Sequence, residues 1–188
     1  MITLDLKDII LQADFSPIYM GQTEKEVVQI LGKPGHRHDD GFGSIMFCYG
    51  CYEFYFFDDA LHYFQNDHLK ADCGNHADLI AYENTHFRIN PWFLKSNQDI
   101  PMKQIIALLE GEQVNFKIEN QKVAGKDYRV GEVKDINLSN GVSLNFEHYT
   151  TDFKYDSKGK IIDNKEVFFQ NEMDFVLFAI RYEHFTVQ

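Results

Sequence analysis

Hydrophobic residues spaced three and four positions apart predict a well-bounded helix over residues 23–31. Val27, Ile30 and Leu31 form its apolar stripe. Thr23 and Glu26 stand three residues apart at its start, where they can form a capping box. A glycine and a proline follow directly and predict the end of the helix.

Two further helices are predicted. Leu4, Ile9 and Ile10, with acidic residues between them, indicate a short amphipathic helix that ends near Ser16-Pro17. A later helix begins at Pro101, a residue favoured at the first helical position, and runs to a glycine at position 111.

Aromatic and β-branched segments separated by turn residues predict two groups of antiparallel strands. Residues 35–41 are expected to form a polar loop before the first group, and Asn140-Gly141 is expected to form a tight turn within the second. The segment after Phe175 could be a buried strand or a helix end, and its Phe and Val content favours a strand. The predicted strands are Ser44–Tyr49, Tyr52–Phe57, Leu61–Gln65, Val114–Ile118, Ile136–Leu138, Val142–Glu147, Asp152–Tyr155, Glu166–Phe169 and Phe175–Tyr182.

A capped helix followed by a meander therefore occurs twice. This order predicts an α+β fold of two tandem units, residues 1–94 and 95–188, sharing one body, with the helices packed on one face of the sheet. Charge is divided unevenly between them. Residues 1–94 hold 6 Lys and Arg against 14 Asp and Glu, a net charge of −8 out of the total of −11.

Composition restricts the class of protein. Of the 188 residues, 44% are hydrophobic and 15% aromatic, too many for a disordered chain. A net charge of −11 without a basic stripe disfavours nucleic-acid binding. The sequence lacks a long apolar run and a signal-peptide pattern, and three cysteines fit a reducing compartment. We therefore expect a cytoplasmic protein that binds neither nucleic acid nor membrane.

The cysteines raise the question of a metal. Cys48 and Cys51 are followed by Cys73 and His76, a Cys-x2-Cys and Cys-x2-His pattern that is typical of structural zinc sites. However, Cys48 and Cys51 fall at the ends of predicted strands and would point apart unless Gly50 bends the chain. Buried apolar cysteines without zinc are the favoured interpretation.

Catalytic motifs are otherwise missing. His36 and His38, next to two aspartates, could serve a small metal-dependent hydrolase, but a solvated loop is the favoured interpretation. The sequence contains neither a nucleophile elbow nor a phosphate-binding loop. The residues thus give no positive indication of an enzyme.

Acidic turns are the remaining candidate for function. Asp39, Asp40, Asp58 and Asp59, together with His62, lie in or beside predicted turns of the more acidic half. Such a surface can steer and dock a basic protein, although it can also serve only to keep the domain soluble. These five residues are the predicted partner-binding residues.

Two segments resemble known families. Residues 21–34, a glycine and a capped helix ending in Leu31-Gly32-Lys33-Pro34, resemble the repeat of small outer-membrane assembly lipoproteins of the SmpA/OmlA type and of β-lactamase-inhibitor protein. Residues 49–56 resemble the Tyr-Gly-x-x-Glu-x-x-Phe segment of bacterial proteins from toxin and immunity loci. The resemblance implies an α+β scaffold that binds a protein. We therefore expect a non-enzymatic immunity protein that neutralises a basic toxin domain, with zinc stabilisation or metal-dependent hydrolysis as the alternatives.

Overall fold

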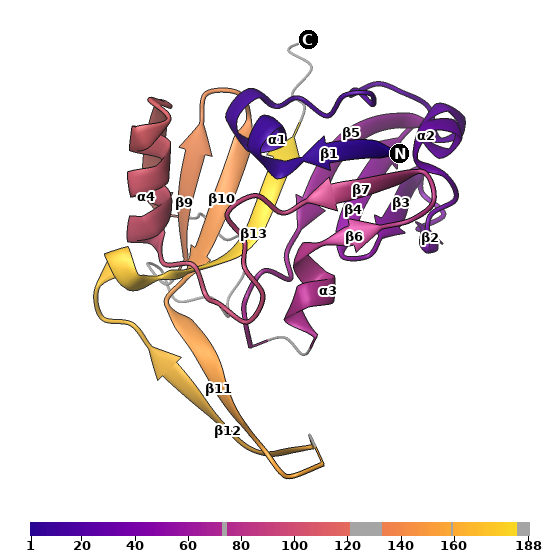
Figure 1. Ribbon diagram of the computed structural model, residues 1–188. Helices are drawn as coiled ribbons and strands as arrows, with labels where there is room; N and C mark the ends of the chain where they lie inside the picture. The colour runs from indigo at the N-terminus through magenta and orange to yellow at the C-terminus, as the bar shows by residue number, and fades with distance from the viewer. Residues whose placement is uncertain (73–74, 121–132, 159, 184–188) are drawn as a thin grey trace.

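The computed structural model describes residues 1–72, 75–120, 133–158 and 160–183, and its main feature is an eight-stranded sheet (Figure 1). Neighbouring strands are antiparallel throughout, in the order β2, β3, β4, β5, β13, β10, β9, β8. The two halves of the chain meet where β5 pairs with β13. The bounds are β2 (His36–Asp39), β3 (Ser44–Tyr49), β4 (Tyr52–Phe57), β5 (Ala60–Asn66), β8 (Phe116–Asn120), β9 (Val133–Leu138), β10 (Val142–Glu147) and β13 (Val176–Glu183).

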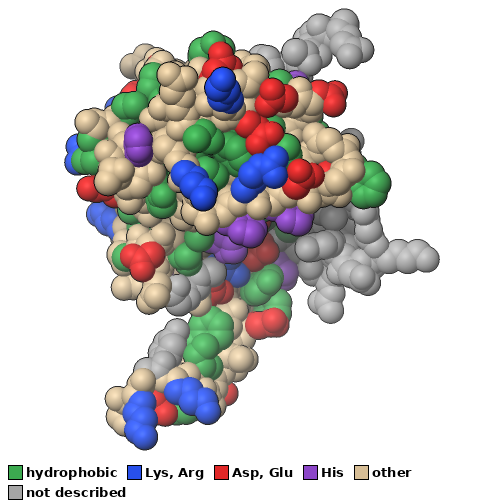
Figure 2. Space-filling view, turned by 90° about the vertical axis from the view of Figure 1, so that its right-hand side faces the viewer, with side chains coloured by type: hydrophobic (Ala, Val, Ile, Leu, Met, Phe, Trp, Pro, Cys, Tyr) green, Lys and Arg blue, Asp and Glu red, His purple; other side chains and the backbone are tan. Residues whose placement is uncertain are grey.

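Two smaller sheets accompany it. In the first, β1 (Ile2–Asp5) pairs in parallel with β7 (Phe87–Asn90), which also pairs with β6 (Tyr82–Glu83). The second is a hairpin of β11 (Tyr149–Tyr155) and β12 (Ile161–Phe168). This hairpin projects from the body as an arm, with lysine side chains at its end and apolar side chains along it (Figures 1 and 2).

The helices are α1 (Leu6–Gln12), α2 (Glu24–Leu31), α3 (His76–Ile80) and α4 (Met102–Gly111), with one 3-10 turn, η1 (Glu172–Asp174). The capping box predicted for α2 is confirmed. Thr23 Oγ1 accepts a hydrogen bond from the Glu26 N–H at 3.3 Å, and Glu26 Oε2 accepts one from the Thr23 N–H at 2.8 Å. Among the described residues, none of the helices is long and apolar enough to cross a membrane.

One face of the large sheet belongs to the hydrophobic core. Along β4 the side chains of Tyr52, Phe54 and Phe56 are buried, whereas those of Glu53 and Tyr55 are only half-buried. Buried residues of α1, α2 and α4 belong to the same core cluster as the inward side chains of the sheet. These helices therefore cover one face and leave the polar side chains on the other.

Most predicted strands are confirmed. The bounds of β3, β4 and β10 are those predicted, and the other predicted strands appear with shifted ends. The ambiguous segment after Phe175 forms strand β13. The α+β class with an antiparallel sheet is therefore confirmed, whereas the division into units 1–94 and 95–188 stays a prediction, because both halves contribute to one sheet.

Two predictions of local structure were wrong. Residues 36–39, expected in a polar loop, form edge strand β2 paired with β3. All four of their side chains are exposed, so no hydrophobic alternation marks this strand. Leu4 and Asp5, expected in the first helix, belong instead to β1, because β7 supplies a partner 85 residues further along the chain. Asp5 then caps α1 by accepting a hydrogen bond from the Lys7 N–H.

Candidate functional site

The open face of the large sheet carries a continuous row of side chains that are almost all polar. Paired residues share a face, because side chains alternate in direction along each strand. The register aligns one residue from each of the eight strands, and all eight are exposed or half-buried. In order across the sheet they are His36, Cys48, Glu53, Gln65, Arg181, Ser143, Asn137 and Lys117.

Four side chains near the middle of this face form a hydrogen-bonded network. The Tyr55 hydroxyl and Gln65 Nε2 both donate to Glu53 Oε2, at 2.7 and 2.6 Å, and the Tyr63 hydroxyl donates to Gln65 Oε1 at 2.8 Å. Burial raises the pKa of Tyr63 to about 12. Burial, together with the adjacent Glu53, also raises the pKa of Tyr55. Both phenols therefore stay protonated at neutral pH and act as hydrogen-bond donors.

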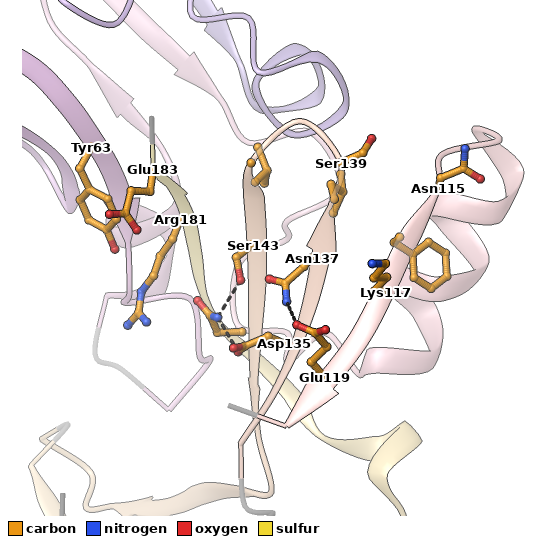
Figure 3. A pocket seen from close by; sticks show the side chains of 15 residues that line it. Tyr63, Asn115, Lys117, Glu119, Asp135, Asn137, Ser139, Ser143, Arg181 and Glu183 are labelled. Carbon is orange, nitrogen blue, oxygen red and sulfur yellow. Dashed lines mark hydrogen bonds between the residues drawn. The ribbon is translucent and has the colours of Figure 1, made fainter. Parts of the chain in front are cut away.

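A cavity of about 730 Å³ lies beside this network, over β8, β9, β10 and β13 (Figure 3). Small-molecule sites typically have volumes of roughly 300–1,000 Å³. Charges of both signs line the cavity: Lys117, Glu119, Asp135, Arg181 and Glu183. The open face thus includes a space of ligand size with positive and negative groups.

Asp135 and Asn145 lie side by side in this cavity. Asn145 Nδ2 donates to Asp135 Oδ1 at 2.6 Å and to Ser143 Oγ at 3.1 Å. Burial raises the pKa of Asp135, although the Asn145 hydrogen bond and the charge of Arg181 act in the opposite direction. The cavity therefore contains a carboxyl group that ionises less readily than an exposed aspartate.

The four aspartates predicted to bind a partner lie in or directly beside two neighbouring turns. Asp39 ends β2 and Asp40 follows it in the β2–β3 turn, whereas Asp58 and Asp59 form the β4–β5 turn. The Asp58 N–H donates to the Gly43 carbonyl at 3.3 Å, which links the two turns. We call residues 39–43 together with 58 and 59 the acidic rim. The structure thus brings together residues that lie up to 20 positions apart.

Aspartate side chains also order the β2–β3 turn by accepting hydrogen bonds from its backbone N–H groups. Asp39 Oδ1 accepts a hydrogen bond from the Gly41 N–H at 2.9 Å, and this bond lowers the pKa of Asp39. Asp40 Oδ1 accepts bonds from the N–H groups of Phe42 and Ser44, at 2.7 and 3.1 Å. The turn presents the Phe42 side chain to solvent, 95% exposed.

The β4–β5 turn is built differently. Asp58 and Asp59 both have positive φ, 49° and 62°, a conformation that aspartate tolerates better than most residues. Asp59 Oδ1 accepts a hydrogen bond from the Glu24 N–H at 3.2 Å, at the start of α2. His62, the fifth predicted residue, packs against the exposed Phe57 with ring centroids 6.1 Å apart. All five predicted residues therefore lie at one end of the sheet.

Three of the four members of the predicted zinc set lie in the part of the chain that the structure describes. His76 is buried, with Nε2 2.9 Å from the Leu69 carbonyl, and its Nδ1 accepts a hydrogen bond from the Asn97 N–H at 2.8 Å. Burial raises the pKa of both the Cys48 and Cys51 thiols. Cys73 lies outside the described residues. Within the described ranges, no three His, Cys, Asp or Glu side chains form a group that could hold a metal ion.

The histidines of the hydrolase alternative are also accounted for. His36 and His38 are exposed on β2, opposite Cys48 and Met46 of β3. Arg37, between them, pairs with Glu24 at 3.1 Å and with Asp39 at 3.4 Å. Among the described residues, neither histidine belongs to a group of three His, Cys, Asp or Glu side chains that could hold a metal ion.

Sequence reasoning missed Asp135, Asn145 and Arg181, the residues that give the cavity its chemistry. A pattern was present in residues 142–147, where Ser143 and Asn145 alternate with apolar residues. Alternation of this kind marks one face of a strand as polar. It does not indicate which polar residues of other strands will share that face.

Comparisons with protein-family models, curated proteins and solved structures found no match to this chain.

Proposed function

We propose that this chain is a non-enzymatic binding protein whose acidic rim covers a basic site on another protein, and that its role is that of an immunity protein against a cognate bacterial toxin. The observation that carries the proposal is the position of Phe42. This ring is 95% exposed in the β2–β3 turn, which a backbone hydrogen bond links to the β4–β5 turn, and the acidic rim formed there contains four aspartates.

Phe42 has the properties of a binding anchor. Exposed aromatic rings contribute much of the affinity of protein interfaces when a partner pocket buries them. Asp40 fixes the turn through the backbone N–H groups of Phe42 and Ser44, so the ring is presented on ordered backbone. Preorganisation of this kind lowers the entropy cost of binding.

The charge of the rim specifies the kind of partner. The hydrogen bond from Gly41 lowers the pKa of Asp39 and so favours its ionised form. Residues 1–94, which include the whole rim, carry a net charge of −8. A positively charged surface would be attracted to this end of the sheet, which raises the association rate and fixes the orientation of the complex.

The proposal is tested by measuring binding to the protein that the neighbouring gene encodes, because immunity proteins are usually encoded beside their toxins. Two double variants remove the negative charges of the rim while keeping the structure of its turns. They are Asp39→Asn with Asp40→Asn, and Asp58→Asn with Asp59→Asn. Asparagine keeps the Oδ1 acceptor and tolerates positive φ, so the turns persist while four charges are lost. Phe42→Ala removes the anchor, and Ile162→Ala on the distant arm is the matched control for loss of an exposed apolar side chain.

We expect Phe42→Ala to weaken the complex at least tenfold, about 1.4 kcal/mol. The asparagine variants should slow association and reduce its dependence on salt. Ile162→Ala should change neither. Unchanged affinity and unchanged salt dependence in all the rim variants would refute the proposal.

A further inference from the structure

The cavity over β8, β9, β10 and β13 contains an unused buried acceptor. Asn145 is 2% exposed, and its Nδ2 donates to both Asp135 and Ser143. Its Oδ1 is buried and has no hydrogen-bond partner. The orientation of the amide follows from Asp135, because exchanging the amide oxygen and nitrogen would place two acceptor oxygens 2.6 Å apart.

An unused buried donor lies on the next strand. Arg181 on β13 is directly opposite Ser143 on β10, so its side chain stands on the same face as that of Asn145 (Figure 3). Arg181 Nε is buried and has no hydrogen-bond partner. Its guanidinium lies 5.8 Å from the Phe178 ring, and the described residues offer it no ion pair within 4.0 Å. Buried polar groups are nearly always paired, so this donor and acceptor together indicate a missing partner.

We infer that this cavity binds a ligand carrying a carboxylate next to an N–H group, the chemistry of a free α-amino acid or of the C-terminus of a peptide chain. The carboxylate pairs with the Arg181 guanidinium, whose planar fork matches it. The adjacent N–H donates to Asn145 Oδ1. This site is separate from the acidic rim and goes beyond the proposed function.

The lining disfavours ligands of a single charge. A simple anion would satisfy Arg181 but would leave Asn145 Oδ1 unpaired and would face the carboxylates of Glu119 and Glu183. A simple cation would face Arg181. A group with a donor and an acceptor side by side satisfies both buried atoms, and the cavity of about 730 Å³ is large enough to hold it.

Four small probes test the inference on the full-length protein by titration followed through backbone amide NMR shifts. L-alanine represents a free amino acid and N-acetyl-L-alanine a chain terminus. N-acetyl-L-alaninamide lacks the carboxylate, and propionate lacks the N–H. We expect at least one of the first two to shift the amides around Asn145 and Arg181 and to bind about tenfold tighter than both controls. Which of the two binds identifies the source of the ligand.

Two variants test whether the Arg181 guanidinium binds the probe. Arg181→Lys keeps the charge but loses the planar fork, and we expect it to weaken the binding probe about tenfold. Arg88→Lys is the matched control, since Arg88 bonds Thr3 on the smaller sheet, and it should bind the probe normally. If Arg181→Lys does not fold, the shift map of the natural protein decides the question alone.

Two results would overturn the inference. One is the absence of shifts near Asn145 and Arg181 with every probe up to about 20 mM, a concentration that detects very weak binding. The other is equal binding of the controls that lack the carboxylate or the N–H. The asparagine variants of the acidic rim should bind the probe unchanged, so failure of this site and failure of the proposed function give different results.

Discussion

The ammonium group of Lys70 lies 3.0 Å from the carboxylate of Glu147, at the point where β10 leads into the projecting arm. Asp72 is 3.3 Å from the same ammonium, and the Tyr149 ring lies beneath it at 4.1 Å. Burial alone would lower the pKa of Lys70, but Glu147 and Asp72 outweigh it and raise the pKa. The base of the arm is therefore held to the loop after β5 by a buried ion cluster.

Lys70→Met is predicted to destabilise the protein by about 3 kcal/mol, because it removes the buried cation that the largely buried carboxylates of Glu147 and Asp72 share. Urea unfolding at neutral pH measures this change. Lys103→Met is the control: Lys103 pairs with Asp174 at 2.6 Å but its side chain is 61% exposed, so its loss should cost less than about 1 kcal/mol. Equal losses in the two variants would contradict the assigned role of Lys70. The pKa of Lys70 is higher in the folded protein than in the unfolded chain. The stabilisation that protonated Lys70 provides is therefore complete below the ordinary lysine pKa, and it is lost as the pH rises through the pKa of the folded state.

Gly141→Ala is predicted to destabilise the protein by about 1–2 kcal/mol. Gly141 has a φ of +93°, and a Cβ there would lie 3.3 Å from the Glu183 carbonyl oxygen and from the Tyr182 ring. Gly111→Ala, at the end of α4, would meet nothing within 4 Å, and we expect a gain of about 0.5 kcal/mol from better helix propensity. Thermal unfolding compares the pair. Stabilisation by Gly141→Ala would show that the Asn140-Gly141 turn does not need its left-handed backbone.

The free energy of unfolding of the Asp135→Asn variant is predicted to increase relative to that of the natural protein as the pH rises. Burial raises the pKa of Asp135 in the folded state. A raised folded pKa means that stability is lost as the pH rises from the unfolded value, about 3.9, through the folded one. Asparagine does not ionise, and its Oδ1 can still accept the bond from Asn145. Urea unfolding at acidic and at neutral pH measures the difference, with exposed Asp78→Asn as the control; a pH-independent difference would contradict the prediction.

His76→Phe is predicted to cost about 3 kcal/mol, because it removes the hydrogen-bond partner of the Leu69 carbonyl at a buried position and that of the part-buried Asn97 N–H. His68→Phe, at a half-exposed side chain, is the control and should cost far less. Because both His76 nitrogens already contact backbone groups, adding one equivalent of zinc to the natural protein should leave its Tm unchanged. A rise in Tm with zinc that His76→Phe abolishes would restore the zinc alternative.

Local chemistry explains which elements could be predicted. The capping box of α2 needs only Thr23 and Glu26, three residues apart, and the turn at Asn140-Gly141 needs only two neighbours. Strands β3 and β4 carry aromatic residues bounded by turns, so their limits were correct. By contrast, β1 forms because Phe87–Asn90 lies beside it, and β2 forms because β3 offers it a backbone partner. The residues of β1 and β2 by themselves do not indicate that these segments form strands.

The candidate sites divide in the same way. The sequence by itself determined that Asp40, Asp58 and Asp59 lie in turns, since their residue types fit the turn conformations, whereas Asp39 is the last residue of strand β2. Only the tertiary structure decided that the two turns touch and that Phe42 of the first turn is exposed there. The cavity depended entirely on tertiary structure: Asn145 and Arg181 became neighbours because β10 pairs with β13 in one register. Hydrophobic patterning fixes which face of a strand is buried, but pairing between distant strands decides which polar groups meet on the other face.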